Sequence, residues 1–545
     1  MVAAGGRWRR SSRAAALVLA AGLVLAACGD GAEDPVEDSD TPEDEAAPDG
    51  DAEAPDEEAT EDGARQGGDL VFARTRDNAG MDPVEAVETD TIYVLDHIFE
   101  TLFATSDDGS EVVPKLASGV EISDDALTYT VALRDDVTFS NGEPMTSEDV
   151  RWSVERALND SPFGFLLSAI DTIDTPDEGT VVFNLQFPWA PFLADLSLWA
   201  AGIMPAEFGG MEPEEFFENP IGTGPFTLDE WNPGESIRLV RNPNYWQEGK
   251  PYLDSVTWTL VPDENTRMLQ LEGEQADIIS EVPLSQMDAL NSKDGIVADS
   301  FELATVFWLS FNTTEPPFDD IHLRRAIAHA IDKEAIADAV LFGFGGPACS
   351  VISPVVPFHD PDTPCLEHDL ELAADELAQS AYPDGVTVEY LVGDQTPDRP
   401  IAEIIQNQLA PLGIDVELRP IDFGQFYSTV FEFDYQMAYT GWTMDIPDPD
   451  QKIAFMFDPE LGGGDSYSTG YENPEMIELV RAGQQAVDLD ERAEIYAQIQ
   501  ALAAEESPFI PLVVLDNAFA WREDVRGLYI NPVGKRNLEN VWLER

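Results

Sequence analysis

Three carboxylates fall within six residues of one proline-containing segment. Residues 441–450 read Gly-Trp-Thr-Met-Asp-Ile-Pro-Asp-Pro-Asp, so the acidic side chains are Asp445, Asp448 and Asp450. Grouped carboxylates can bind Ca²⁺, but the two prolines and the lack of a complete ligand loop argue against a calcium site. Helix capping and turn formation around the prolines are the simpler roles, above all for Asp448 and Asp450. We therefore predict no metal site and no cofactor, and the role of Asp445 stays open.

The sequence lacks the motifs of hydrolytic enzymes. It has five histidines and contains neither a Gly-x-Ser-x-Gly nor a His-Glu-x-x-His motif. Pairs of acids, as used in glycoside hydrolysis, are frequent, but among 106 acidic and 29 basic residues they carry no information. We predict a protein that is not an enzyme, and a secreted hydrolase stays the alternative from another class.

The N-terminal residues have the features of an export signal. Arginines at positions from Arg7 to Arg13 precede an apolar run, Ala14–Ala27, which is too short to span a bilayer. The run ends Leu-Ala-Ala-Cys-Gly, which resembles the lipobox of bacterial lipoproteins. The resemblance implies that residues 1–27 are removed and that Cys28 carries a lipid. An ordinary secreted protein is the alternative, and Sec and twin-arginine export both stay open.

A strongly acidic segment follows the lipobox. Residues 30–67 hold 17 acids against one base and almost no large apolar side chain. Such a segment cannot bury enough apolar surface to offset the entropy lost on ordering, and its charges repel one another. We predict that residues 28–67 form a disordered tether that anchors the protein, through its lipid, at the outer face of the cell membrane.

The formal net charge of −77 excludes two classes of partner. A surface so acidic repels nucleic acid and anionic membranes. It suits solubility at high salt, where charges are strongly screened, and it carries no information about the ligand. The remaining chain of about 480 residues is long enough for two or three domains with their own cores.

Two cysteines besides Cys28 lie close together in the sequence. Cys349 and Cys365 are sixteen residues apart in a region rich in glycine and proline. In an oxidising compartment outside the cytoplasm, a disulfide between them is the favoured pairing. A metal site is the alternative, because His359 and His368 are near, but the spacing matches no zinc pattern.

Strand and helix patterns alternate along the rest of the chain. Ile414–Leu418 alternates apolar and acidic residues as a half-buried strand does, and it follows directly on Gly413 and an apolar-striped helix over Ile401–Leu412. Thr146 and Asp149 resemble a capping box ahead of another helix. Further strands are expected at Leu70–Ala73, Thr128–Leu133, Val181–Leu185, Ile237–Val240, Val256–Leu260 and Val386–Leu391. This order predicts α/β lobes.

Several sequence blocks resemble the family 5 solute-binding proteins, which include dipeptide-, oligopeptide- and nickel-binding members. The blocks are Leu127–Arg134, Phe139–Gly142, Asn219–Phe226, Arg241–Trp246, Phe311–Thr314 and Arg324–Asp332. The resemblance implies an α/β, two-lobed fold of the periplasmic-binding-protein type (class II), which closes about a hinge. It places lobe one at 68–105, 206–308 and 508–545, an inserted domain at 106–205, and lobe two at 309–507.

The resemblance also implies where a ligand binds. In peptide-binding members an Asp at the place of Asp445 binds the N-terminal ammonium of the ligand. The neighbours that the resemblance implies are Trp442, Thr443 and Met444 beside Asp445, and Val87, Glu88 and Thr89 across the cleft. A carboxylate that loses water as the lobes close is costly unless a cation pairs with it, so closure would favour the liganded form.

One departure from the family bears on the ligand. Dipeptide-binding members grip the ligand's carboxylate with an Arg shortly before the helix Ile401–Leu412, but residues 391–397 contain no base here. A longer peptide, held at its ammonium and along its backbone, fits better than a dipeptide.

We predict a monomeric component of an ABC importer that delivers oligopeptides to its permease and ATPase. A nickel chelate, a sugar or another small solute, and a signalling receptor on the same scaffold, are the alternatives.

Overall fold

The computed structural model describes residues 63–545 apart from 395–396 and 462–465. The predicted signal peptide, Cys28 and most of the predicted tether lie outside the described residues. The described residues all belong to one compact unit, Glu57–Arg545. Among the helices that the structure describes, none has both the length and the apolar character that a membrane crossing requires.

The first lobe is built on a seven-stranded sheet. In spatial order its strands are β12 (Ile296–Phe301), β19 (Asn517–Arg522), β11 (Ile278–Ser280), β1 (Asp69–Arg74), β10 (Ser255–Leu260), β9 (Ser236–Arg241) and β8 (Phe226–Asn232). Because β1 runs parallel to both β10 and β11, the carboxyl ends of these strands open on one edge. Phe72 of β1 packs on one face of the sheet. On the other face Ala73 packs with α5 (Glu264–Glu272) and α6 (Met287–Asn291).

A four-stranded antiparallel sheet is inserted into the first lobe. Its order is β4 (Ala117–Ile122), β5 (Thr128–Leu133), β7 (Thr180–Leu185) and β6 (Ile170–Asp177). Helix α2 (Ser147–Asp160) begins at the predicted capping box, which is confirmed, since Thr146 N–H donates to Asp149 Oδ2 at 2.8 Å. Val131 and Phe183 of this sheet share one apolar core with the first sheet. The elements around it are α1 (Thr89–Leu95), β2 (Phe103–Thr105), β3 (Val112–Pro114), α3 (Phe192–Asp195) and α4 (Pro213–Glu218).

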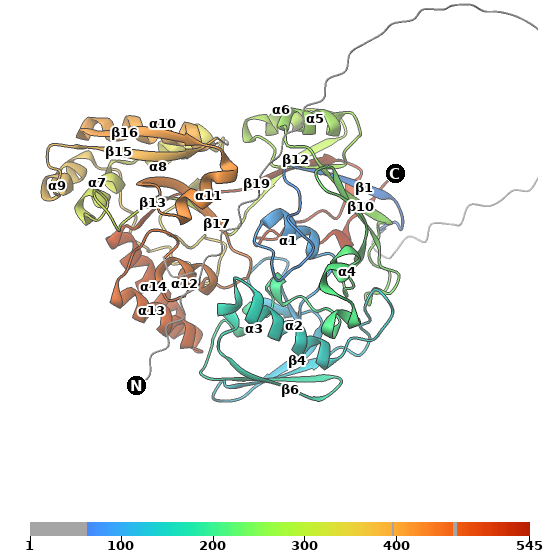
Figure 1. The fold of residues 1–545 in the computed structure, drawn as a ribbon. Helices are drawn as coiled ribbons and strands as arrows, with labels where there is room; N and C mark the ends of the chain where they lie inside the picture. The colour runs from blue at the N-terminus through green and yellow to red at the C-terminus, as the bar shows by residue number, and fades with distance from the viewer. Residues whose placement is uncertain (1–62, 395–396, 462–465) are drawn as a thin grey trace, which may run out of the picture. The chain divides into compact units, whose positions relative to one another are not determined.

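The second lobe is a six-stranded sheet covered by helices on both faces (Figure 1). Its order is β14 (Gly345–Pro347), β18 (Phe509–Leu515), β13 (Thr305–Phe311), β17 (Met437–Thr443), β15 (Val386–Gly393) and β16 (Ile414–Ile421). One face carries α7 (Ile321–Ala330), α8 (Lys333–Val340), α9 (Leu370–Gln379) and α10 (Asp398–Leu409). The other carries α12 (Asp450–Phe457), α13 (Pro474–Gln485) and α14 (Leu489–Glu506). Strand β15 runs parallel to both of its neighbours, β16 and β17.

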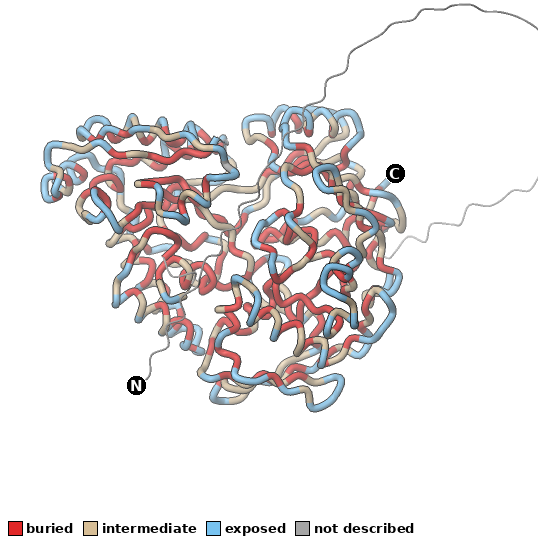
Figure 2. The backbone as a smooth tube through the Cα atoms, in the orientation of Figure 1, coloured by how far each residue is buried: buried red, intermediate tan, exposed pale blue. Residues whose placement is uncertain are grey.

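The apolar cores follow the alternation of the strands. In β13, Trp308 packs with the helices of one face and Leu309 with those of the other. Figure 2 shows the result: buried residues run through the sheets, and exposed residues lie mainly in the outer helices and loops. The strands predicted from the sequence all lie within observed strands. The remaining short strands, β20 (Val525–Arg526) and β21 (Trp542–Leu543), pair with each other near the C-terminus.

Within the described residues the chain passes between the two large sheets twice, and both passages are short. Residues 302–304 join β12 to β13, and Asp516 joins β18 to β19. Two short connections are what a hinge between lobes requires. The pairing also corrects two predicted boundaries. Residues 305–308 and 509–515 belong to the second sheet because β13 and β18 pair along their length there, so both crossings differ from the predicted positions 308 and 508.

Cys349 and Cys365 form a disulfide in the structure. The bond closes a loop whose ends are 16 residues apart in sequence. Closing a loop of that length removes entropy from the unfolded chain, which stabilises the fold by about 3 kcal/mol. We expect the double variant Cys349→Ala/Cys365→Ala to lose a similar free energy of unfolding in urea. The reductant-treated wild type should match the variant, whereas equal midpoints for the oxidised wild type and the variant would contradict this account.

Candidate ligand-binding site

Asp445 lies just beyond the carboxyl end of β17. Trp442 and Thr443 are the last two residues of that strand. The carboxyl ends of parallel strands β15 and β17 open on the same edge of the second sheet, which is where open α/β sheets bind their ligands. The strand thus brings the predicted anchor to the expected edge of the lobe.

The Asp445 carboxylate is partly buried and partly satisfied by its own lobe. Gln451 Nε2 donates to Asp445 Oδ2 at 2.9 Å, and the backbone N–H of Asp445 donates to Gln451 Oε1 at 3.2 Å. Burial raises the pKa of Asp445 to about 7, while hydrogen bonds from Gln451 and Trp442 and the charge of Lys535 act in the opposite direction. Because burial outweighs these partners, a further cation would stabilise the ionised form.

Residues of the first lobe face Asp445. Burial raises the pKa of the Tyr93 hydroxyl, and the charge of Asp445 raises it further, against the opposing effect of Arg536. Lys535 Nζ lies 3.8 Å from Asp96 Oδ2, and the charges of both residues act on Asp445. The end of α1 and the segment around Lys535 therefore supply the groups of lobe one that interact electrostatically with Asp445.

The three predicted binding residues next to Asp445 have different surroundings. The Trp442 ring stacks on Tyr467 with centroids 5.7 Å apart and meets Phe455 edge to face at 5.0 Å. Thr443 Oγ1 lies 2.6 Å from Thr305 Oγ1 on the neighbouring strand. Met444 is fully buried in the core beneath Trp308, so its side chain packs inside the lobe in this conformation.

Val87, Glu88 and Thr89 are exposed at the N-terminal end of α1. The residues of lobe one whose charges couple to Asp445 lie at the other end of this helix and beyond it. In the part of the chain that the structure describes, no hydrogen bond, ion pair or ring contact joins the three residues to Asp445. Their contact with a ligand stays a prediction; the residues of this region that interact electrostatically with Asp445 are Tyr93 of α1 and Asp96, which follows the helix.

Asp448 and Asp450 have roles beyond the predicted turns. Asp448 Oδ1 does accept from the backbone N–H of Asp450 at 2.9 Å, which confirms the turn. Asp448 is also in a buried ion pair with Arg492, whose Nη2 donates to Oδ1 at 2.9 Å. Among the described residues, no three His, Cys, Asp or Glu side chains are grouped to hold a metal ion.

A buried contact joins the inserted region to the second lobe near these acids. The backbone N–H of Ala190 donates to Gln484 O at 2.7 Å. Asp195 is fully buried and accepts from Trp189 Nε1 at 2.7 Å; burial raises its pKa well above the usual range, and the charge of Asp450 raises it further. Sequence reasoning missed this contact, because nothing in the local pattern around Asp195 distinguishes it from other acids.

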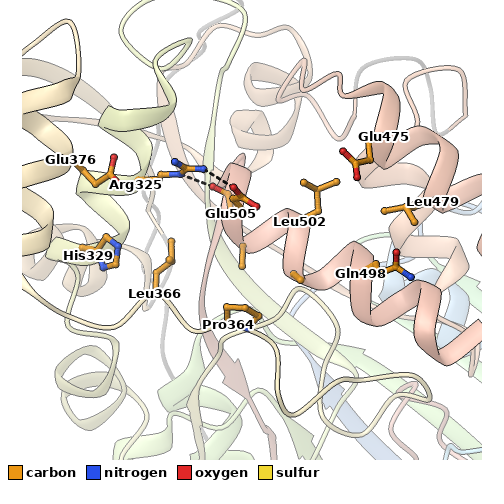
Figure 3. A pocket seen from close by; sticks show the side chains of 12 residues that line it. Arg325, His329, Pro364, Leu366, Glu376, Glu475, Leu479, Gln498, Leu502 and Glu505 are labelled. Carbon is orange, nitrogen blue, oxygen red and sulfur yellow. Dashed lines mark hydrogen bonds and ion pairs between the residues drawn. The ribbon is translucent and has the colours of Figure 1, made fainter.

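A cavity of about 550 Å³ lies elsewhere on the second lobe, between α7, α13, α14 and the loop near Cys365. Figure 3 shows Leu502 and Leu366 along it, and Arg325 beside Glu505 at its rim; Arg325 Nε donates to the backbone oxygen of Glu505 at 2.7 Å. The cavity shares no lining residue with the surroundings of Asp445. It is a feature separate from the predicted site.

Comparison with known proteins assigns the fold and the family. A family model described as bacterial extracellular solute-binding proteins, family 5 middle, matches residues 111–463, more than half of the chain. The glutathione-binding protein GsiB of Salmonella typhi is 28% identical over 474 residues, which cover 85% of this chain and 92% of that protein.

Two solved structures have similar folds. DppA from Helicobacter pylori, in complex with the peptide STSA, is 27% identical with a TM-score of 0.79, and the match covers 88% of this chain and 99% of that one. AgaA from A. tumefacien R10, in complex with agropinic acid, is 29% identical with a TM-score of 0.77, with the same coverage of both chains. The predicted α/β fold of the periplasmic-binding-protein type is confirmed. The chain therefore belongs to the family 5 bacterial extracellular solute-binding proteins of ABC importers, and it is a binding protein and not an enzyme.

Proposed function

We propose that the protein captures oligopeptides by their free N-terminal ammonium at Asp445. The observation that carries this proposal is the position of a partly buried carboxylate at the carboxyl end of β17, facing α1 of the other lobe. Its own lobe supplies hydrogen bonds from Gln451 and Trp442, which leave acceptor capacity on the carboxylate. An ammonium can use that capacity with up to three donors.

Charge pairing would link capture to closure of the lobes. An ionised carboxylate that loses water without gaining a counter-charge is destabilised by several kcal/mol. A ligand ammonium offsets that cost in the closed form and offers less advantage in the open form, where water solvates Asp445. The ligand therefore shifts the population toward the closed form, which a permease can distinguish.

The relatives support a peptide-like ligand. GsiB is named for glutathione, and DppA was solved with the peptide STSA. AgaA was solved with agropinic acid, so the choice of a peptide for this chain rests on Asp445 and its surroundings.

We further propose that the lipid on Cys28 and the acidic tether hold a monomer at the outer face of the cell membrane, beside the permease and ATPase that it serves.

The test compares Asp445→Asn with the wild type by isothermal titration calorimetry. The probes are tetra-alanine with a free N-terminus and its N-acetylated form. A charge-assisted hydrogen bond contributes roughly 1.5–3 kcal/mol, so we expect the variant to bind the free peptide about 10- to 150-fold more weakly. Asp415→Asn, an exposed acid on β16, is the matched control and should leave affinity unchanged. Equal binding of the free and acetylated peptides by the wild type would remove Asp445 from the mechanism.

A further inference from the structure

A second carboxylate lies at the same edge of the second lobe as Asp445. Asp398 is the first residue of α10, the helix that follows β15. Strands β15 and β17 are parallel neighbours, with Tyr390 beside Met437 and Leu391 beside Ala438. Their carboxyl ends therefore open side by side, and the two acids follow from adjacent strands of one sheet.

Asp398 is buried to an extent that is unusual for an acid in the first turn of a helix. Such acids are ordinarily exposed and interact favourably with the helix dipole. Asp398 is only 9% exposed; its carboxylate accepts a hydrogen bond from its own backbone N–H, and within the described residues no cation is paired with it. Burial raises its pKa to about 7, and the nearby charge of Asp394 raises it further. The dipole alone does not compensate for this burial.

An aromatic wall connects Asp398 to Asp445. Tyr427 of α11 (Phe423–Phe431) lies close enough to Asp398 for the acid to raise its pKa, after the larger effect of burial, and it hydrogen-bonds with Tyr467. Tyr467 in turn donates to the backbone oxygen of Gly441 at 3.2 Å and stacks on Trp442, which hydrogen-bonds to Asp445. The wall thus has a carboxyl group at each end, and aromatic faces attract cations.

The facing bases of lobe one are themselves paired with acids of that lobe, and at the Asp445 end Lys535 is paired with Asp96. Arg76, beyond the carboxyl end of β1, acts on Tyr427 from the opposite lobe. It is engaged by acids of its own lobe, with Asp90 Oδ2 at 3.4 Å and Glu281 Oε1 at 3.9 Å. The stretch 391–397, from the end of β15 to the start of α10, contains no Lys, Arg or His. The wall therefore favours a positive group of the ligand at both ends.

We propose that Asp398 forms a second cation subsite, so that the preferred ligands are peptides carrying a Lys or Arg side chain in addition to the N-terminal ammonium. This inference rests on the proposed function, because the ammonium at Asp445 fixes which end of the peptide lies at β17. It assigns the substrate class: basic oligopeptides are favoured over neutral peptides of the same length.

The test is a titration with tetra-alanine peptides in which one residue, at position two, three or four, is Lys or its Nε-acetylated form. At one position or more, the charged form should bind about tenfold or more tightly than the acetylated form. Asp398→Asn should abolish that difference while leaving the affinity for the acetylated peptides within about twofold. Asp398→Glu should retain the preference, which excludes a loss of folding as the cause, and Asp415→Asn is the matched control.

The outcomes distinguish a failure of the second subsite from a failure of the proposed peptide-binding function. If no Lys position improves binding, or if Asp398→Asn keeps the full preference, the second subsite is overturned while ammonium-dependent binding at Asp445 can still hold. If N-acetylation of the peptide has no effect in any background, the peptide function itself fails, whatever Asp398 does.

Discussion

Replacing Arg492 with methionine is expected to lower the free energy of unfolding by about 3–5 kcal/mol, because it leaves a buried carboxylate without its counter-charge. Arg492 and Asp448 are both nearly inaccessible, and two hydrogen bonds join them, one at 2.5 Å and one at 2.9 Å. The charge of Asp450 acts on the same guanidinium. Without Arg492, Asp448 and Asp450 would repel each other inside the lobe.

Urea denaturation followed by tryptophan fluorescence measures this loss. Arg399→Met is the matched control, because Arg399 pairs with Glu403 at 2.9 Å in an exposed position of α10 and such pairs contribute about 0–1 kcal/mol. The double variant Arg492→Met/Asp448→Leu should recover most of the stability, since it removes both charges of the buried ion pair. If Arg492→Met costs no more than Arg399→Met, the buried pair does not stabilise the lobe.

The elements with a strong local pattern were predictable from the sequence. Ile414–Leu418 alternates apolar and acidic side chains, and the structure extends that strand to Ile421. The capping box at Thr146 identified the start of α2 because both of its side chains lie within one helical turn. The family blocks then predicted how these elements assemble, which no local pattern specifies.

The parts that were missed depend on contacts between distant residues. Residues 509–515 were assigned to lobe one, but the strand they form pairs with β13, which lies about 200 residues earlier in the chain. The contact of Met444 with a ligand stays a prediction; in the structure its side chain is buried in an apolar core of the second lobe.

The inserted region and the second lobe meet at the hydrogen bond between Ala190 and Gln484, and buried acids lie beside it. These acids make the contact between the two regions sensitive to pH. Asp195 faces Asp450, Asp448 and Arg492, and Asp450 faces Asp448, Arg492, Gln484 and Tyr496. Arg492 is therefore the shared counter-charge of three carboxylates, those of Asp195, Asp448 and Asp450. Burial first, and then the charge of Asp448, raise the pKa of Asp450 to about 7 from its ordinary 3.8.

The sign of the effect follows from which state binds the proton. Between pH 3.8 and about 7 the folded protein holds a proton on Asp450 that the unfolded chain has lost, so stability falls as pH rises through this range and is level above it. At about 1.4 kcal/mol per pH unit, the loss has an upper limit on the order of 4 kcal/mol. Opening of the lobes can reduce this loss of stability, because water then reaches the carboxylates.

Asp450→Asn should remove most of this pH dependence, because the amide keeps the shape of the side chain without a charge. We expect the variant to be more stable than the wild type at pH 8, by about 2–4 kcal/mol, and to lose most of that advantage at pH 4, where Asp450 is protonated in the folded protein and partly protonated in the unfolded chain. Thermal melts at the two pH values measure this, and comparison with Asp415→Asn removes the general effect of the −77 net charge. Parallel pH profiles for Asp450→Asn and the wild type would mean that water already solvates Asp450 in the folded protein. In that case the contact between Ala190 and Gln484 would not depend on protonation of Asp450.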